Sequence, residues 1–164
     1  ATTGNIGLGP NAAQAGGEHT FSQWFTSDAW PADKLCMYPA EFIYTQAADG
    51  TVTFEQLTDI AYTPGDFAAS IGVAGDSCHG TDVAPSLDGI KNVSFSPANS
   101  NATIDGEYRG TNINFTDGGF MSWYVGISTI EIIEITESTL FVRMVDASNS
   151  GLAWYCKYQT DNPN

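Results

Sequence analysis

The chain has 164 residues, of which 19 are acidic and 5 basic, and its formal net charge is −14 at pH 7. A surface this acidic repels phosphate backbones, which excludes nucleic acid as a partner. No apolar run reaches the roughly 18 residues of a membrane span, so direct membrane insertion is not expected. The length fits one domain. We expect residues 1–164 to form a single monomeric domain excised from a larger multidomain protein.

Short β-rich runs separated by Gly, Pro, Asn and Asp dominate the chain, and helical periodicity is almost absent. A helical turn is expected only within 20–34, before Pro31. Residues 57–89 show little alternation and are interpreted as a long loop region. The predicted strands, in chain order, are 41–46, 51–56, 90–95, 102–107, 111–116, 122–127, 129–136, 139–145 and 152–159. This pattern predicts an all-β fold, a jelly-roll-like β-sandwich of two antiparallel sheets.

Three cysteines, Cys36, Cys78 and Cys156, lack the Cys-x-x-Cys spacing of a zinc knuckle. Their odd number suggests one disulfide bond and one free thiol. Cys156 shares a strand face with Leu152 and Trp154, which favours a buried free cysteine in the core. We therefore expect a Cys36–Cys78 disulfide, as an extracellular setting favours, although connectivity cannot be read from sequence.

Glu131 and Glu134, in "STIEIIEIT" (128–136), raise the question of a catalytic carboxylate pair. On a regular strand, residues three apart are separated by about 10 Å and point to opposite faces, unless a bulge intervenes. Glycosidase carboxyl groups lie about 5–5.5 Å or about 6.5–9.5 Å apart. Laminarinase-type sandwiches use Glu-x-Asp-x-x-Glu or Glu-x-Asp-x-Glu, and Ile133 stands where that Asp is needed. The pattern favours a protein that is not an enzyme.

Two further motifs are weak. "GDSCHG" (75–80) matches the nucleophile loop of trypsin-like proteases in three letters, but Ser77 and His79 are only two residues apart. We interpret that match as chance. No Asp-x-Asp-x-Asp-Gly calcium loop is present, while a looser structural calcium site built from loop carboxylates is compatible with the sequence. No cofactor is required.

The aromatic residues suggest a ligand. Sugar rings have apolar C–H faces that stack on Trp or Tyr, while polar side chains bind their hydroxyls. For Trp24 and Trp30, core packing is an equal alternative, whereas Trp154 is expected in the core. The predicted carbohydrate-binding residues are Trp24, Trp30 and Trp123 as a stacking platform, Tyr124 beside it, and His79, Asp33 and Arg109 as polar candidates.

Four segments together carry a family resemblance: "GNIGLGP" (4–10), "WFTSDAWPADKLCMYPAEFIY" (24–44), "FMSWYVGISTIEIIEITESTLFVRM" (120–144) and "GLAWYCKY" (151–158). Their order resembles a β-sandwich module of Bacteroidetes surface glycan-binding proteins. The resemblance covers about half of the chain, at both ends, and leaves the middle unmatched. Ile130 departs from the family pattern, which often has Tyr there.

The resemblance implies a non-catalytic carbohydrate-binding module, extracellular or at the outer-membrane surface. Its partner would be a polysaccharide or oligosaccharide such as the β-1,3-glucan laminarin. One alternative is a glycoside hydrolase or other glycan-modifying enzyme on a laminarinase-like sandwich. Another is an adhesion or structural module without a small ligand. Clustered loop tryptophans favour binding over a purely structural role, and the missing paired carboxylates favour binding over cleavage.

Overall fold

The computed structural model describes residues 5–11, 24–27, 36–98 and 110–160. Within these residues the fold is all-β, with a nine-stranded and a two-stranded antiparallel sheet, so the predicted all-β fold with two antiparallel sheets is confirmed. The large sheet has the spatial order β2 (Phe25–Ser27), β1 (Ile6–Pro10), β11 (Leu152–Gln159), β10 (Thr139–Val145), β9 (Thr129–Ile135), β8 (Thr111–Phe115), β7 (Lys91–Pro97), β4 (Val52–Gln56) and β3 (Phe42–Gln46).

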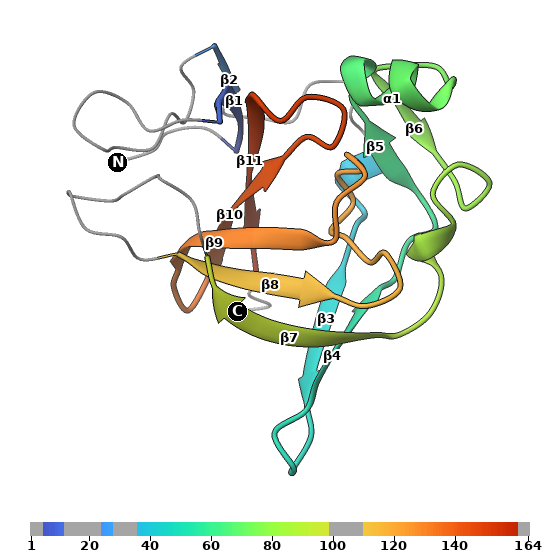
Figure 1. The fold of residues 1–164 in the computed structure, drawn as a ribbon. Coiled ribbons are helices and arrows are strands. Elements are labelled where there is room, and N and C mark those ends of the chain that lie inside the picture. The colour runs from blue at the N-terminus through green and yellow to red at the C-terminus, as the bar shows by residue number, and fades with distance from the viewer. Residues whose placement is uncertain (1–4, 12–23, 28–35, 99–109, 161–164) are drawn as a thin grey trace, which may run out of the picture.

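The small sheet pairs β5 (Ala61–Thr63) with β6 (Ser77–His79), and the helix α1 (Gly65–Ile71) lies between them in sequence. Figure 1 shows these three elements together at one end of the molecule. Pro64 occupies the N-cap position of α1 without a side-chain capping bond, and Gly72 ends the helix with φ 76°, a left-handed conformation that glycine adopts without strain. A short 3-10 helix, η2 (Pro85–Leu87), precedes β7.

The large sheet curls around the core. In Figure 1, β7, β8 and β9 run across the view, while β3 and β4 run at a steep angle to them. Five strands separate β3 from β11 in the sheet order. The rings of Phe42 on β3 and Tyr158 on β11 nevertheless meet edge to face, with centroids 5.1 Å apart. The curl therefore brings the free edge of β3 close to the end of β11.

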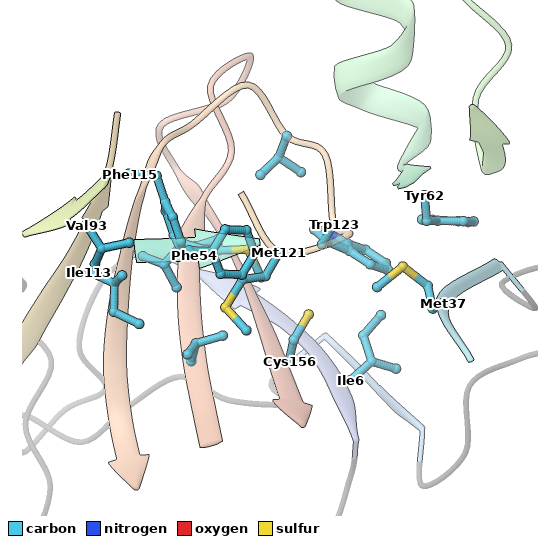
Figure 2. Close-up of a cluster of buried hydrophobic side chains, with 14 residues drawn as sticks. Ile6, Met37, Phe54, Tyr62, Val93, Ile113, Phe115, Met121, Trp123 and Cys156 are labelled. Atoms are coloured by element: carbon cyan, nitrogen blue, oxygen red, sulfur yellow. The ribbon is translucent and has the colours of Figure 1, made fainter. Parts of the chain in front are cut away.

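Alternation along the strands decides which side chains fill the core. On β10, Val142 and Met144 face inward, whereas Phe141 and Arg143 lie on the other face. Figure 2 shows the inner cluster, in which Trp123 lies near Tyr62 and Met37. The Trp123 ring packs 4.8 Å from Tyr62 and 4.8 Å from Trp154, centroid to centroid. Trp154 is only partly buried but packs against this core, as predicted.

Seven predicted strands are confirmed to within two residues at each end: β3, β4, β7, β8, β9, β10 and β11. Residues 122–127 do not form a strand, because Ser122 and Gly126 have φ 54° and 75°. Residues 57–89 are more than a loop, since they contain β5, α1, β6 and η2. In the stretch 20–34, residues 25–27 form β2 rather than a helical turn. The predicted strand 102–107 lies outside the described residues.

The cysteine prediction is confirmed. Cys36 and Cys78 form a disulfide bond with Cα atoms 6.1 Å apart, and Cys156 is a free, fully buried thiol in the core. Burial raises the pKa of the Cys156 thiol far above its usual range, so it stays protonated and unreactive. No helix in the described part of the chain has the length and apolar character to cross a membrane.

Candidate functional site: a groove along β3

A groove of about 700 Å³ runs along β3. Its lining side chains come from the segment before β3, from β3 itself, from the turn between β9 and β10, and from the end of β11. They are Asn5, Met37, Tyr38, Ala40, Glu41, Phe42, Ile43, Tyr44, Met121, Ile135, Thr136, Thr139, Leu140, Lys157, Tyr158, Gln159 and Thr160. No β4 residue is among them, so the groove lies on the side of β3 that faces away from β4.

The floor of the groove is apolar but anchored by two phenols. The Tyr158 hydroxyl donates to the Met121 carbonyl oxygen at 2.9 Å, and the Tyr44 hydroxyl donates to the Met121 sulfur at 3.2 Å. Burial raises the pKa of both tyrosines, and the neighbouring Cys156 raises that of Tyr158 further. Both hydroxyls therefore stay neutral at ordinary pH and hold the floor in place.

Large side chains are left exposed at the mouth. Tyr38 is 56% exposed and Tyr44 is 37% exposed. The Tyr44 hydroxyl points toward Met121 while part of its ring faces solvent. Ile43 and Ile135 are also exposed, the latter at 67%. Together they give the groove aromatic and aliphatic walls of the kind that pack against the faces of a ligand.

Neutral polar groups surround these apolar walls. Thr136 and Thr139 come from the β9–β10 turn, and Gln159 from the end of β11. Glu41 and Lys157 are the charged lining residues, and neither side chain forms an ion pair with any residue that the structure describes. The mouth thus combines hydroxyl, amide, carboxylate and ammonium groups around two partly exposed rings.

The main chain of β3 adds further hydrogen-bonding groups. The Leu57 N–H bonds to the Glu41 carbonyl at 3.0 Å, and the Ala47 N–H bonds to the Thr51 carbonyl at 2.9 Å. Because antiparallel pairs alternate, odd-numbered residues from 41 to 47 bond to the β4 side. The N–H and C=O groups of Phe42, Tyr44 and Gln46 therefore point outward, on the side where the groove lies.

The structure does not bring the predicted platform together. Trp123 is fully buried, so its assignment as a stacking ring is wrong. Trp24 is 55% exposed, but it precedes β2, at the opposite edge of the large sheet from β3. Tyr124 is half-buried and packs on Phe67 and Phe120, with centroids 5.1 and 4.8 Å away. Trp30, Asp33 and Arg109 lie outside the described residues.

His79 lies on β6, bonded to its own hairpin and not to the groove. Its Nε2 is 2.7 Å from the Ala74 carbonyl oxygen and 3.1 Å from the Ser77 hydroxyl, which is itself 3.0 Å from the same carbonyl. A carbonyl only accepts, so the short contact places a proton on Nε2. That nitrogen then has no lone pair to take the Ser77 proton. Ser77 and His79 are therefore not arranged as nucleophile and base.

A β-bulge changes the expectation for Glu131 and Glu134. Glu131 pairs with Arg143 and Glu134 with Phe141, with a register shift between Phe141 and Val142. Since Phe141 and Arg143 share a face of β10, both glutamates lie on that face, which is the bulge exception that the sequence left open.

The two carboxylates nevertheless have different environments. Glu131 is buried and bonds to the Arg143 guanidinium at 3.2 Å, whereas Glu134 is exposed. Arg143 also donates to the Tyr155 hydroxyl at 3.2 Å and to the Asn11 side-chain oxygen. Neither glutamate lines the groove. Glu131 thus belongs to a polar cluster that joins β9, β10, β11 and the end of β1.

Comparison with models of protein families and with curated proteins found no match. In the residues that the structure describes, no group of three His, Cys, Asp or Glu side chains could hold a metal ion. The groove is therefore assessed on its own chemistry.

Sequence reasoning missed the groove residues Tyr38, Tyr44 and Ile135. A weak signal existed, because "FIYTQ" (42–46) alternates large aromatic residues with β-branched or polar ones and contains no charge. The sequence does not show that this strand lies at the edge of a curled sheet.

Proposed function

We propose that this protein is a non-catalytic carbohydrate-binding domain that holds part of an extracellular polysaccharide in the groove along β3. The observation that supports this most is the pairing of two partly exposed tyrosine rings, Tyr38 and Tyr44, with neutral polar side chains around one groove. The resemblance to surface glycan-binding modules makes β-1,3-glucan, as in laminarin, the first ligand to test.

The chemistry of a sugar suits such a groove. One face of a pyranose ring is made of C–H groups that pack on an aromatic ring, while its hydroxyls both donate and accept hydrogen bonds. Thr136, Thr139 and Gln159 supply side-chain partners, and the outward N–H and C=O groups of β3 supply main-chain partners. The apolar walls would set the orientation of the sugar chain. The polar groups would recognise the arrangement of its hydroxyls.

The alternative is a glycan-cleaving enzyme that uses Glu131 and Glu134, which share a face because of the bulge. Two observations favour binding over cleavage. Glu131 already neutralises the buried Arg143, and neither carboxylate borders the groove. An acid and a nucleophile would have to act on a sugar bound between them.

The test is a titration of the protein with laminarin-type and other neutral oligosaccharides by calorimetry, beside an assay for released reducing ends. We expect binding without cleavage. Tyr38→Ala and Tyr44→Ala should each weaken binding by about 1–3 kcal/mol, by analogy with stacking on nucleic-acid bases. Trp24→Ala is the matched control, because Trp24 is about as exposed as Tyr38 but is not among the groove's lining residues.

Three outcomes would contradict the proposal. If no glycan binds, the groove serves another ligand. If Trp24→Ala abolishes binding while both tyrosine variants keep it, the site lies at the β2 edge. If reducing ends appear and Glu131→Gln stops their release, the protein is an enzyme.

A further inference from the structure

The acidic and basic side chains at the groove differ in how far they are exposed to solvent. Glu41 is exposed and lines the groove, and Glu137 is exposed in the turn between the lining residues Thr136 and Thr139. Among the lining residues that the structure describes, Lys157 is the only basic one, and it is half-buried. Among the described residues, the two carboxylates are therefore more accessible to a ligand at the mouth than the ammonium group is.

The acidic residues elsewhere in the molecule add to the negative electrostatic potential at the groove. The formal net charge of the whole chain is −14. Charges beyond the Debye length of about 8 Å at physiological salt are screened, so Glu41 and Glu137 dominate locally and the remaining charge acts mainly at low salt. A carboxyl group on an incoming ligand would be repelled, and an ammonium group would be attracted.

We infer that the groove distinguishes glycans by charge: it favours chains that carry free amino groups over neutral chains of the same backbone, and it disfavours uronic-acid chains. This rests on the proposed function, since it names the class of glycan that the same groove prefers. An amino group in place of a sugar hydroxyl gives Glu41 a charge-assisted hydrogen bond in place of a neutral one. Because Glu41 is exposed, the preference is modest, roughly threefold to fivefold in affinity.

Four oligosaccharides of equal length and β-1,4 linkage test the inference: oligomers of glucose, N-acetylglucosamine, glucosamine and glucuronic acid. N-acetylation removes the charge but keeps the backbone, so the second and third differ chiefly at the amine. In mildly acidic, low-salt buffer we expect glucosamine oligomers to bind most tightly and glucuronic acid oligomers to bind most weakly. The preference should shrink with added salt and in alkaline buffer, where the amines lose their charge.

Two variants test whether Glu41 causes the preference for chains with free amino groups. Glu41→Gln should bring the affinities for the glucosamine and N-acetylglucosamine oligomers closer together, and the ratio of the two affinities is the readout. Asp66→Asn is the matched control, because it changes the net charge equally but lies on α1, which contributes no residue to the groove. It should keep most of the preference.

The failures of the two proposals can be told apart. If none of the four oligomers nor laminarin binds, the proposed function fails. If neutral oligomers bind and the glucosamine oligomer binds no better, the charge inference fails while the proposed function stands. Equal loss of preference in Glu41→Gln and Asp66→Asn would also overturn it, because the effect would then come from overall charge.

Discussion

Two regions of the molecule, the surroundings of the small sheet (the small-sheet end) and the mouth of the groove (the groove end), expose their aromatic residues to different extents. At the small-sheet end, Tyr62 and Trp123 are fully buried against each other, with ring centroids 4.8 Å apart. At the groove end, Tyr38, Tyr44 and Ile135 lie at the mouth with large parts of their surfaces exposed. Aromatic side chains are thus fully buried in the first region and partly exposed in the second.

Backbone pairing explains the difference. The loop that carries Trp123 is bonded like a strand: the Tyr62 N–H donates to the Ser122 carbonyl and the Tyr124 N–H to the Tyr62 carbonyl, both at 2.8 Å. With its backbone groups satisfied, this loop can cross the core. In contrast, among the described strands β3 has a partner on one side only. A residue in a loop is therefore not exposed for that reason alone, and a residue in a strand is not buried for that reason alone.

The largest effect that tests this comparison is on stability. Trp123→Ala should lower the free energy of unfolding by about 5 kcal/mol, the upper end for a large aromatic side chain removed from a core. The reason is that its ring contacts both Tyr62 and Trp154, and the surrounding loop cannot fully collapse into the cavity. Urea unfolding followed by fluorescence measures the change.

Trp24→Ala provides the control, since Trp24 is 55% exposed at the β2 edge and its loss should cost less than about 1 kcal/mol. A comparable loss in both variants would contradict the contrast between buried and exposed tryptophans. So would a Trp123→Ala protein of normal stability.

The next largest effect comes from the link between the two ends. The disulfide joins Cys36, next to the lining residues Met37 and Tyr38, to Cys78 on β6. It spans 42 residues, for which chain entropy predicts a stabilisation of about 4 kcal/mol. The double variant Cys36→Ser/Cys78→Ser should therefore unfold at clearly lower denaturant concentration than the oxidised protein.

Chemical reduction of the natural sequence is the matched control and should shift the midpoint similarly. If oxidised and reduced proteins unfold at the same urea concentration, the bond does not stabilise the link between the ends. Cys156 should not confuse the measurement, because it is buried and reacts with thiol reagents only after unfolding.

Local patterns were sufficient for much of the fold. Alternation predicted β7 to β11, and the face shared by Leu152, Trp154 and Cys156 marked the free thiol. α1 was missed because seven residues offer too short a period to recognise. The bulge in β9 was named only as an exception, because nothing in "TIEIIEI" marks where an extra residue enters the ladder.

The site was not predictable in the same way. Whether Tyr44 is exposed depends on β3 having no second neighbour and on the curl that brings β11 close to it. Both follow from pairings between distant segments, such as Val52 with Val93. Composition alone suggested aromatic stacking, but it pointed to the tryptophans, of which Trp123 is a core residue.

A smaller effect is expected at alkaline pH, at the groove end. Burial raises the pKa of Tyr44 and Tyr158 in the folded protein above 10.0, the ordinary value. Below pH 10 both hydroxyls are protonated in the folded and unfolded states, so the full stability is present. Above it the unfolded chain loses these protons first, so stability falls as pH rises toward the folded values.

Thermal melts at increasing pH, with tyrosinate absorbance recorded in parallel, measure this fall. Tyr44→Phe removes one of the two phenols and keeps the ring, so its melting temperature should decline less steeply than that of the natural protein. Identical pH profiles would show that the Tyr44 phenol does not contribute.

The smallest expected effect isolates the free edge of β3. Tyr44→Ala removes the ring, and Tyr44→Pro removes the ring and the outward N–H as well. Since the Tyr44 N–H points away from β4, proline there breaks no bond of the ladder, and edge strands tolerate it. Both variants should therefore melt at similar temperatures.

If a bound glycan accepts a hydrogen bond from this N–H, Tyr44→Pro should bind more weakly than Tyr44→Ala by about 1 kcal/mol. Thr45→Pro is the contrast, because its N–H bonds to β4 and its loss should lower stability itself. Equal binding by the alanine and proline variants, with equal melting temperatures, would show that the β3 main chain takes no part in recognition and that the side chains of the groove act alone.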